Sequence, residues 1–160
     1  MSSMNFDPNA FLDLPIEEAF ERRNPLPAKD YVAVINEVTV RQWQSKDKYN
    51  DDGTLKSGIA YDIAMSLQIP QDLREALGYE KDSLAIKDSI MVDLNAQGGL
   101  DTAKGKNGAM RAYREALDMN KAGETFRPRL MTGRMLLVRI KHEEYQGNIQ
   151  ERVGGVAKLP

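Results

Sequence analysis

Apolar and polar residues alternate in three successive stretches of the chain, at Tyr31–Trp43, Ile59–Ile69 and Ile86–Leu94. Alternation with a period of two is typical of a strand with one face on the core and the other in solvent. A fourth stretch, Arg134–Tyr145, is followed by a tight turn and a last stretch that ends near Val156. The pattern therefore predicts five strands, of which the fourth and fifth form a hairpin.

The alternation also predicts which residues form the core. In the first stretch four valines share one face, which we expect to be buried: Val32, Val34, Val38 and Val40. The opposite face carries Tyr31, Glu37, Thr39, Arg41 and Trp43. In the third stretch Asp88 interrupts the apolar side, which indicates an edge strand or a β-bulge.

Two segments have the signals of helices. Pro70–Gly78 indicates a short helix between the second and third strands, because proline suits the start of a helix and glycine its end. A longer helix begins at Asn107, a good N-cap residue, and we expect Gly123 to end it. Its apolar stripe consists of Met110, Tyr113, Ala116 and Leu117.

Three strands, a helix and two more strands are the element order of a five-stranded oligonucleotide/oligosaccharide-binding (OB) barrel. We therefore predict a mainly β fold, a β-barrel with α insertions. The main helix lies between strands 3 and 4, and the extra short helix lies between strands 2 and 3. Residues 29–160 would form this domain and residues 1–28 an N-terminal arm. The arm mixes apolar and acidic residues with four prolines, and we expect one or two turns of helix from Pro15 to Arg22.

At 160 residues the chain is long enough for one domain with its own core. It has no cysteine, which excludes disulfides and zinc–thiolate sites, and its single histidine, His142, cannot build a multi-histidine metal site. No stretch is apolar enough for a membrane span, and the N-terminus lacks the form of a signal peptide. We expect a cytoplasmic protein without membrane association, metal or cofactor.

The known catalytic motifs do not occur in the sequence. The glycine- and lysine-rich segment Gly98–Gly108 departs from a nucleotide-binding P-loop, because Leu100 stands at the first glycine position and Asn107 at the magnesium-binding Ser/Thr. A looser role for its lysines and amides in holding a nucleic-acid phosphate is compatible with this sequence. We predict that the chain is not an enzyme. The alternative is a metal-dependent nuclease built from scattered carboxylates, such as Asp62, Asp88 and Asp93.

Charge is unevenly distributed along the chain, whose net charge is −2. Between Lys104 and Lys141 there are ten basic and three acidic residues, a local balance of +7. Such segregation gives an acidic protein a basic face that suits a phosphate backbone. The alternative is a solvated helix and strand whose charges happen to be basic.

Aromatic side chains are the second requirement for binding single strands, because bases stack on them without regard to sequence. Trp43 lies at the mouth of the lysine-rich segment 44–58, which we expect to be a long, mobile loop. Packing beneath that loop is the alternative role of Trp43, and Tyr61 and Tyr113 are expected in the core. The predicted nucleic-acid-binding residues are Arg41, Trp43, Lys46, Lys48, Tyr49, Lys56, Lys104, Lys106, Arg111, Arg127, Arg129 and Arg134.

The end of the chain resembles a known family. The segment Gly133–Val153, which reads GRMLLVRIKHEEYQGNIQERV, is similar to the final hairpin of phage-encoded OB-fold single-stranded DNA-binding proteins of replication and recombination modules. From Lys29 to Lys158 the likeness extends to the order of the elements. The resemblance implies sequence-independent coating of single-stranded DNA, its protection from nucleases, and work beside phage or host replication and recombination proteins in the host cytoplasm. Many such proteins end in an acidic tail that recruits partners, whereas this chain ends in VAKLP.

The arm supports a second interpretation of a different class. Its acidic and apolar stretch from Phe6 to Glu21 is not explained by nucleic-acid binding. The chain would then be a phage interaction module, whose arm and loops bind a host or phage protein and either inhibit it or help to assemble it. The arm is also a candidate for packing on the domain or on a neighbouring copy, which would make a homo-oligomer.

Overall fold

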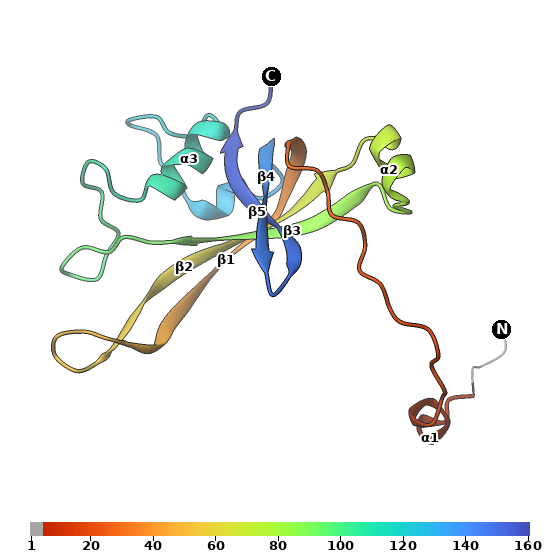
Figure 1. Ribbon diagram of the computed structural model, residues 1–160. Coiled ribbons are helices and arrows are strands. Elements are labelled where there is room, and N and C mark those ends of the chain that lie inside the picture. Colours follow the sequence, from red (N-terminus) through yellow and green to blue (C-terminus); the bar gives the residue numbers. More distant parts are fainter. Residues whose placement is uncertain (1–4) are drawn as a thin grey trace.

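The computed structural model describes residues 5–160, which form one five-stranded antiparallel sheet with short helices around it (Figure 1). The strand order is β3–β2–β1–β4–β5. The strands are β1 (Asp30–Tyr49), β2 (Leu55–Gln68), β3 (Ser83–Met91), β4 (Met135–Tyr145) and β5 (Asn148–Ala157). The helices are α1 (Pro8–Leu12), α2 (Gln71–Leu77), α3 (Gly108–Ala116) and the 3₁₀ helix η1 (Pro128–Met131). The fold is mainly β, with α2 and α3 inserted between the strands where the sequence predicts them.

The sheet stays open between its two end strands. Strand β1 pairs with both β2 and β4, and hydrogen-bonded ladders join β2 to β3 and β4 to β5. Within residues 5–160 no ladder joins β3 to β5, although the two strands lie near each other and α3 contacts both. A hollow of about 310 Å³ lies between these three elements. The predicted closure of the barrel is therefore not seen.

The core lies on one face of the sheet, which we call the inner face. In β4 the buried residues are Leu136, Val138 and Ile140, as the alternation predicts. Met110 and Tyr113 of α3 pack into the same core, and η1 contributes its last residue. Because α3 and η1 both pack on this face, the loops that flank them lie beside it.

A β-bulge at Asn36 changes the pairing of β1 part of the way along the strand. Ile35 pairs with Met65, and Glu37 pairs with the next residue of β2, Ala64. Asn36 is therefore an extra residue in β1, opposite no residue of its own. Because side chains of a strand alternate between faces, one extra residue moves all that follow to the other face.

The bulge overturns part of the predicted core. Before it, the buried residues of β1 are Tyr31, Ala33 and Ile35. Beyond it, Val38 packs against the core as expected, whereas Val40 lies on the same face but is 61% exposed, so its predicted burial is wrong. The prediction of four valines on one buried face is wrong for Val32 and Val34, which are half-buried on the opposite face.

The sequence predicts an edge strand or a β-bulge at Asp88. The structure has the edge strand, β3, and no bulge. The ladder between β2 and β3 is regular throughout. The carboxylate of Asp88 accepts a hydrogen bond from the hydroxyl of Tyr113 in α3, at 2.7 Å. Burial raises the pKa of Asp88 above its ordinary value, although that hydrogen bond acts in the opposite direction. An aspartate on the apolar side is tolerated because α3 supplies its partner.

Helix α2 agrees with the prediction, whereas α3 is shorter than expected. Gly78 adopts a left-handed conformation, with φ of 75°, directly after α2. Helix α3 begins after Asn107 but ends at Ala116, because Asp118 takes a φ of 57° and turns the chain. The predicted end at Gly123 is therefore wrong. No helix among residues 5–160 is long and apolar enough to cross a bilayer.

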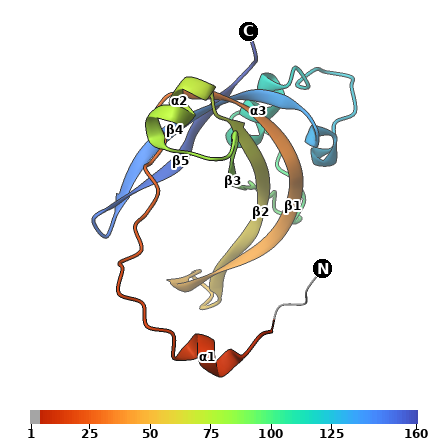
Figure 2. The same cartoon turned by 90° about the vertical axis from the view of Figure 1, so that its right-hand side faces the viewer.

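The predicted arm, residues 1–28, divides into two parts, and its first four residues lie outside the described part. Helix α1 lies at Pro8–Leu12, and the helix expected from Pro15 to Arg22 is not formed. Residues 5–22 are exposed and leave the domain (Figure 2), whereas Leu26 is fully buried in the core. The segment from Arg23 onward therefore packs as part of the domain.

Candidate nucleic-acid interface

Beyond the bulge, β1 and β2 form a long hairpin that projects from the domain (Figures 1 and 2). Its two faces follow from the pairing register, because directly paired residues project to the same side of a sheet. The inner face carries Val38, Val40, Tyr61 and Ile63. The other face, which we call the outer face, carries Thr39, Arg41, Trp43, Gly58, Ala60 and Asp62.

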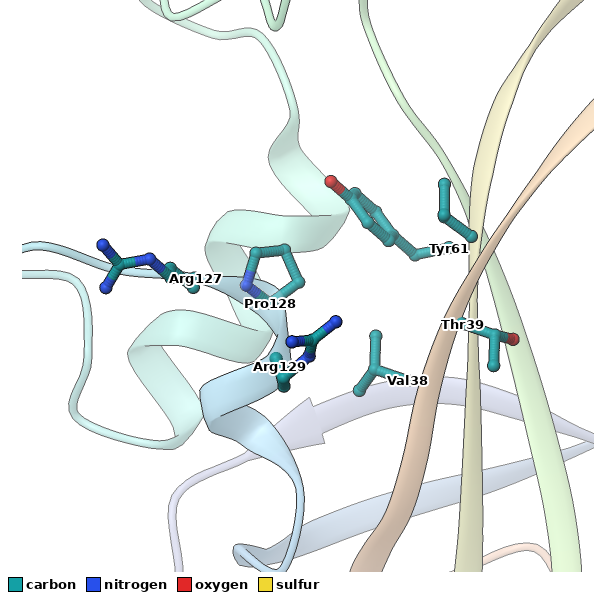
Figure 3. Close-up of a pocket in the computed structure, with 7 residues that line it drawn as sticks. Val38, Thr39, Tyr61, Arg127, Pro128 and Arg129 are labelled. Atoms are coloured by element: carbon teal, nitrogen blue, oxygen red, sulfur yellow. The ribbon is translucent and has the colours of Figure 1, made fainter.

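A hollow of about 430 Å³ lies between the inner face of the hairpin and η1. Figure 3 shows Arg129 and Val38 facing each other, and the ring of Tyr61 extending toward α3. The side chain of Thr39 points to the other side of the strand. The guanidinium of Arg127 extends from η1 away from the hairpin, at the rim of the hollow.

Two further hollows continue this one along the domain. The second, of about 270 Å³, shares Tyr61 and Pro128 with the first. The third, of about 280 Å³, shares four residues with the second: Leu100, Asn107, Met110 and Arg114. We call the three together the inner groove. It runs from the hairpin past η1 to the loop before α3, where Lys104 and Lys106 lie.

Five of the predicted cations line the inner groove. Arg127 and Arg129 lie at its hairpin end, and Lys104, Lys106 and Arg111 lie at its far end. Within residues 5–160 the two arginines and the two lysines take part in no ion pair. Arg111 makes one weak, exposed pair with Glu115, at 3.9 Å. Two acidic residues also line the groove, Asp101 and Glu124. The balance of charge along the groove is positive.

Arg114 and Phe126 belong to the groove but were not among the predicted binding residues. The guanidinium of Arg114 lies over the ring of Phe126, 4.4 Å from its centre, and donates hydrogen bonds to the carbonyl of Met119 at 3.1 and 3.2 Å. The sequence does contain a signal for Arg114: it follows Met110 by one helical turn, so the two side chains lie on the same side of α3. Its role here is to fix the wall of the groove.

Asn107 holds the loop before α3, although it does not cap the helix with its side chain as predicted. Its side chain accepts a hydrogen bond from the amide of Asp93 at 2.9 Å and donates to the carbonyl of Asp101 at 2.8 Å. Its own amide donates to the carboxylate of Asp93 at 2.7 Å. Asn107 therefore fixes the loop that carries Lys104 and Lys106.

On the outer face of the hairpin the charge of Arg41 is neutralised by Asp62. Arg41 donates to the carboxylate of Asp62 at 2.9 Å, and the hydroxyl of Ser89 donates to the same carboxylate at 2.5 Å. The hydrogen bond from Ser89 and the charge of Arg41 lower the pKa of Asp62 below its ordinary value. Arg41 therefore meets an ionised partner across the strands.

Trp43 is half-buried and lies flat against Gly58 on the outer face. A Cβ placed on Gly58 would come within 2.8 Å of the indole. This position is on the opposite side of the hairpin from Arg127 and Arg129. The predicted nucleic-acid-binding residues therefore do not all share one surface.

The remaining predicted residues lie at the tip of the hairpin or apart from it. Segment 44–58 is largely strand, and the turn that replaces the expected long loop spans only residues 50–54. Lys46, Lys48, Tyr49 and Lys56 are exposed along this tip. Arg134 is exposed just before β4 and lines none of the three hollows of the inner groove.

The alternative of a metal-dependent nuclease requires a cluster of metal-binding side chains. Among residues 5–160 no three acidic or histidine side chains gather in a way that would hold a metal ion. His142 instead contacts the carbonyl oxygen of Leu26 through Nε2, at 2.6 Å.

No protein-family model matches the chain, and no curated protein matches it. Any statement of function therefore depends on the site itself.

Proposed function

We propose that the chain binds single-stranded DNA without sequence specificity in the inner groove. The observation that carries this proposal is the set of four cations that make no ion pair within residues 5–160, Arg127, Arg129, Lys104 and Lys106, at the two ends of three adjoining hollows with mainly apolar lining. Unpaired cations gain most from a phosphate, because they lose no existing partner when it binds.

The floor of the groove is apolar and partly aromatic, which suits the bases of a nucleic acid, whereas the cations at its ends suit the phosphates. Tyr61 offers a half-buried ring, and Val38, Val40 and Pro128 add apolar surface around it. Bases of a single strand can turn toward such a floor, whereas those of a duplex are held in their pairs. Contacts of this kind do not depend on base identity, so we expect little sequence preference.

The class of fold is part of the proposal. The strand order β3–β2–β1–β4–β5 is that of an OB barrel opened between its third and fifth strands, and OB folds commonly bind oligonucleotides. The resemblance of the β4–β5 hairpin to phage single-stranded DNA-binding proteins suggests the setting. In that setting the chain would coat and protect single strands during phage DNA replication or recombination.

The test is a titration of a labelled oligo-dT with the full chain, followed by fluorescence anisotropy at several salt concentrations. Four neutralised phosphates predict a log–log salt slope of about −3, since each contributes about −0.7 for a single strand. Duplex DNA and a matching RNA are titrated in parallel. Binding that does not respond to salt, or equal affinity for duplex and single strand, would contradict the proposal.

A further inference from the structure

The distal arm, residues 5–22, exposes an unusual amount of apolar surface. Six large apolar side chains along it are between 55% and 88% exposed: Phe6, Phe11, Leu12, Leu14, Ile16 and Phe20. Soluble chains rarely leave so many large apolar groups together in solvent unless something covers them. The hydrogen bonds made within this segment are local, such as that from the amide of Asn9 to the carboxylate of Asp7 that caps α1. The domain therefore gives these side chains no cover.

The base of the arm is held firmly, which fixes where the distal part starts. Arg23 forms two hydrogen bonds to the carboxylate of Glu151 in β5, at 2.7 and 2.8 Å, and the amide of Leu26 donates to the same carboxylate at 3.1 Å. The side chain of Asn24 donates to the carbonyl of Leu77 at 3.1 Å. In both views the arm leaves the domain on the side away from α3 and η1 (Figures 1 and 2). The distal arm thus points away from the inner groove of its own chain.

The charge and the length of the distal arm indicate which surface it can bind. Residues 5–22 contain five acidic residues and one basic residue. The hairpin end of the inner groove offers the complement, because Arg129 faces Val38 beside the apolar surface of Val40 and Tyr61, and Arg127 stands at the rim. With α1 helical and the other residues extended, this segment spans about 50 Å, at about 1.5 Å and 3.3 Å per residue, which is enough to reach a neighbouring molecule.

We infer that the distal arm of one copy binds in the inner groove of a second copy of this chain. Its aromatic side chains occupy the hollow beside η1, and its carboxylates pair with Arg127 and Arg129. Reciprocal exchange of two arms closes a two-fold dimer. The assembly itself is independent of the proposed function. Only its competition with DNA, which would bind in the same groove, rests on that proposal.

The first test is sedimentation velocity on the full chain, purified with nuclease so that no nucleic acid links the molecules. The wild type is expected to reach twice the mass of one chain as its concentration rises. An arm variant, F6S/F11S/F20S, and a groove variant, R127E/R129E, are each expected to stay at the mass of one chain. The matched control is K81E/K158E, which makes the same change of charge at exposed lysines outside the groove and should still dimerise.

Mixing the two variants separates exchange between copies from folding back of the arm. The groove variant keeps an intact arm and the arm variant keeps an intact groove, so a mixed pair can form one of the two arm–groove contacts. An equimolar mixture should therefore reach the twofold mass at a higher concentration than the wild type, whereas neither variant alone reaches it. A wild-type chain that remains a monomer at every concentration overturns the inference, whether its arm folds back or binds a different protein. Dimerisation of both single variants overturns it as well.

Addition of oligo-dT to the wild-type dimer distinguishes the two proposals. Dissociation of the dimer as DNA binds supports one shared groove. If DNA binds and the dimer persists, the arm exchange stands and the placement of DNA in the inner groove fails. If the wild type is a monomer but binds DNA with the expected salt slope, the proposed function stands and the arm exchange fails.

Discussion

Arginine and an aromatic ring lie on both sides of the β1–β2 hairpin, and the two sides differ in what these side chains already contact. On the outer face Arg41 is paired with Asp62, and Trp43 lies against Gly58. Along the inner groove Arg127 and Arg129 take part in no ion pair within residues 5–160, and the ring of Tyr61 lines an open hollow. Within residues 5–160, therefore, the arginine on the outer side is already paired, whereas Arg127 and Arg129 of the inner groove make no ion pair and Tyr61 lines an open hollow.

The difference shows why a count of cations along the sequence is a poor guide to a binding surface. An exposed ion pair contributes little to stability, but it lowers the gain when one of its members is offered a phosphate. The useful quantity is the number of cations without a partner beside an accessible apolar floor. By that measure the inner groove and not the outer face is the surface to test.

The largest effect is expected from reversing charge on the inner groove. Each arginine that contacts a phosphate is worth about 1.5–3 kcal/mol as a charged hydrogen bond, so R127E/R129E should weaken oligo-dT binding by about 100-fold or more. The matched change on the outer face, R41E, should alter the affinity by less than about threefold, because Arg41 is already paired. Anisotropy titrations at one salt concentration make the comparison, and an equal loss in both variants would contradict it.

Removing an aromatic ring from each face should have the next largest effect. Tyr61→Leu keeps apolar volume in the groove but removes the stacking surface, which predicts a loss of about 1–3 kcal/mol in binding. Trp43→Leu should leave the affinity nearly unchanged, because the indole lies on the opposite face. Thermal melts of both variants check that each is folded. Strong quenching of Trp43 fluorescence by oligo-dT in the wild type would place the DNA on the outer face instead.

A smaller effect is expected from Asp62, and it depends on pH. The folded-state pKa of Asp62 is lowered, so its contribution to stability is present above the unfolded value of about 3.8 and is lost as the pH falls through the folded value. Urea unfolding should show D62N less stable than the wild type near neutral pH, by less than about 1 kcal/mol. The two should converge in acid. A difference that stays constant down to the acid limit would exclude the ionised pair as its cause.

The smallest effect is expected from Gly58→Ala. The added Cβ would meet the indole of Trp43, whose side chain has to move outward from the strand. We expect a shift of tryptophan emission to longer wavelength with little change in unfolding free energy or in DNA affinity. An unchanged emission spectrum would show that the indole is not held against Gly58 in solution.

The features that depend on local signals could be predicted from the sequence. The five strands, the short helix ended by Gly78 and the hairpin closed by Gln146 and Gly147 all follow from alternation and turn residues. The buried face of β4 was also predicted. These features need information only from residues that are neighbours in the chain.

The features that depend on partners far apart in the sequence could not be predicted. The pairing of Arg41 with Asp62 joins residues on two strands, and the bond between Tyr113 and Asp88 joins a helix to an edge strand. The placement of Val32 and Val34 opposite Val38 and Val40 depends on a bulge that has no clear signature in the stretch Tyr31–Trp43. Predicted cations line both ends of the inner groove, but the division of the predicted residues between two surfaces is a property of the register.

The single extra residue at Asn36 has a consequence for how this hairpin can change. The side chains beyond it keep their orientation because Asn36 stays outside the ladder. Deleting Asn36 would place Glu37 directly after Ile35, which is the order in which they already pair with β2, so Val38 would stay on the inner face and Arg41 on the outer face. Pairing Asn36 with Ala64 would instead shift every later residue by one position and turn Arg41 and Trp43 toward η1. The hairpin can therefore lose this residue without changing its faces, but it cannot take the residue into regular pairing without exchanging them.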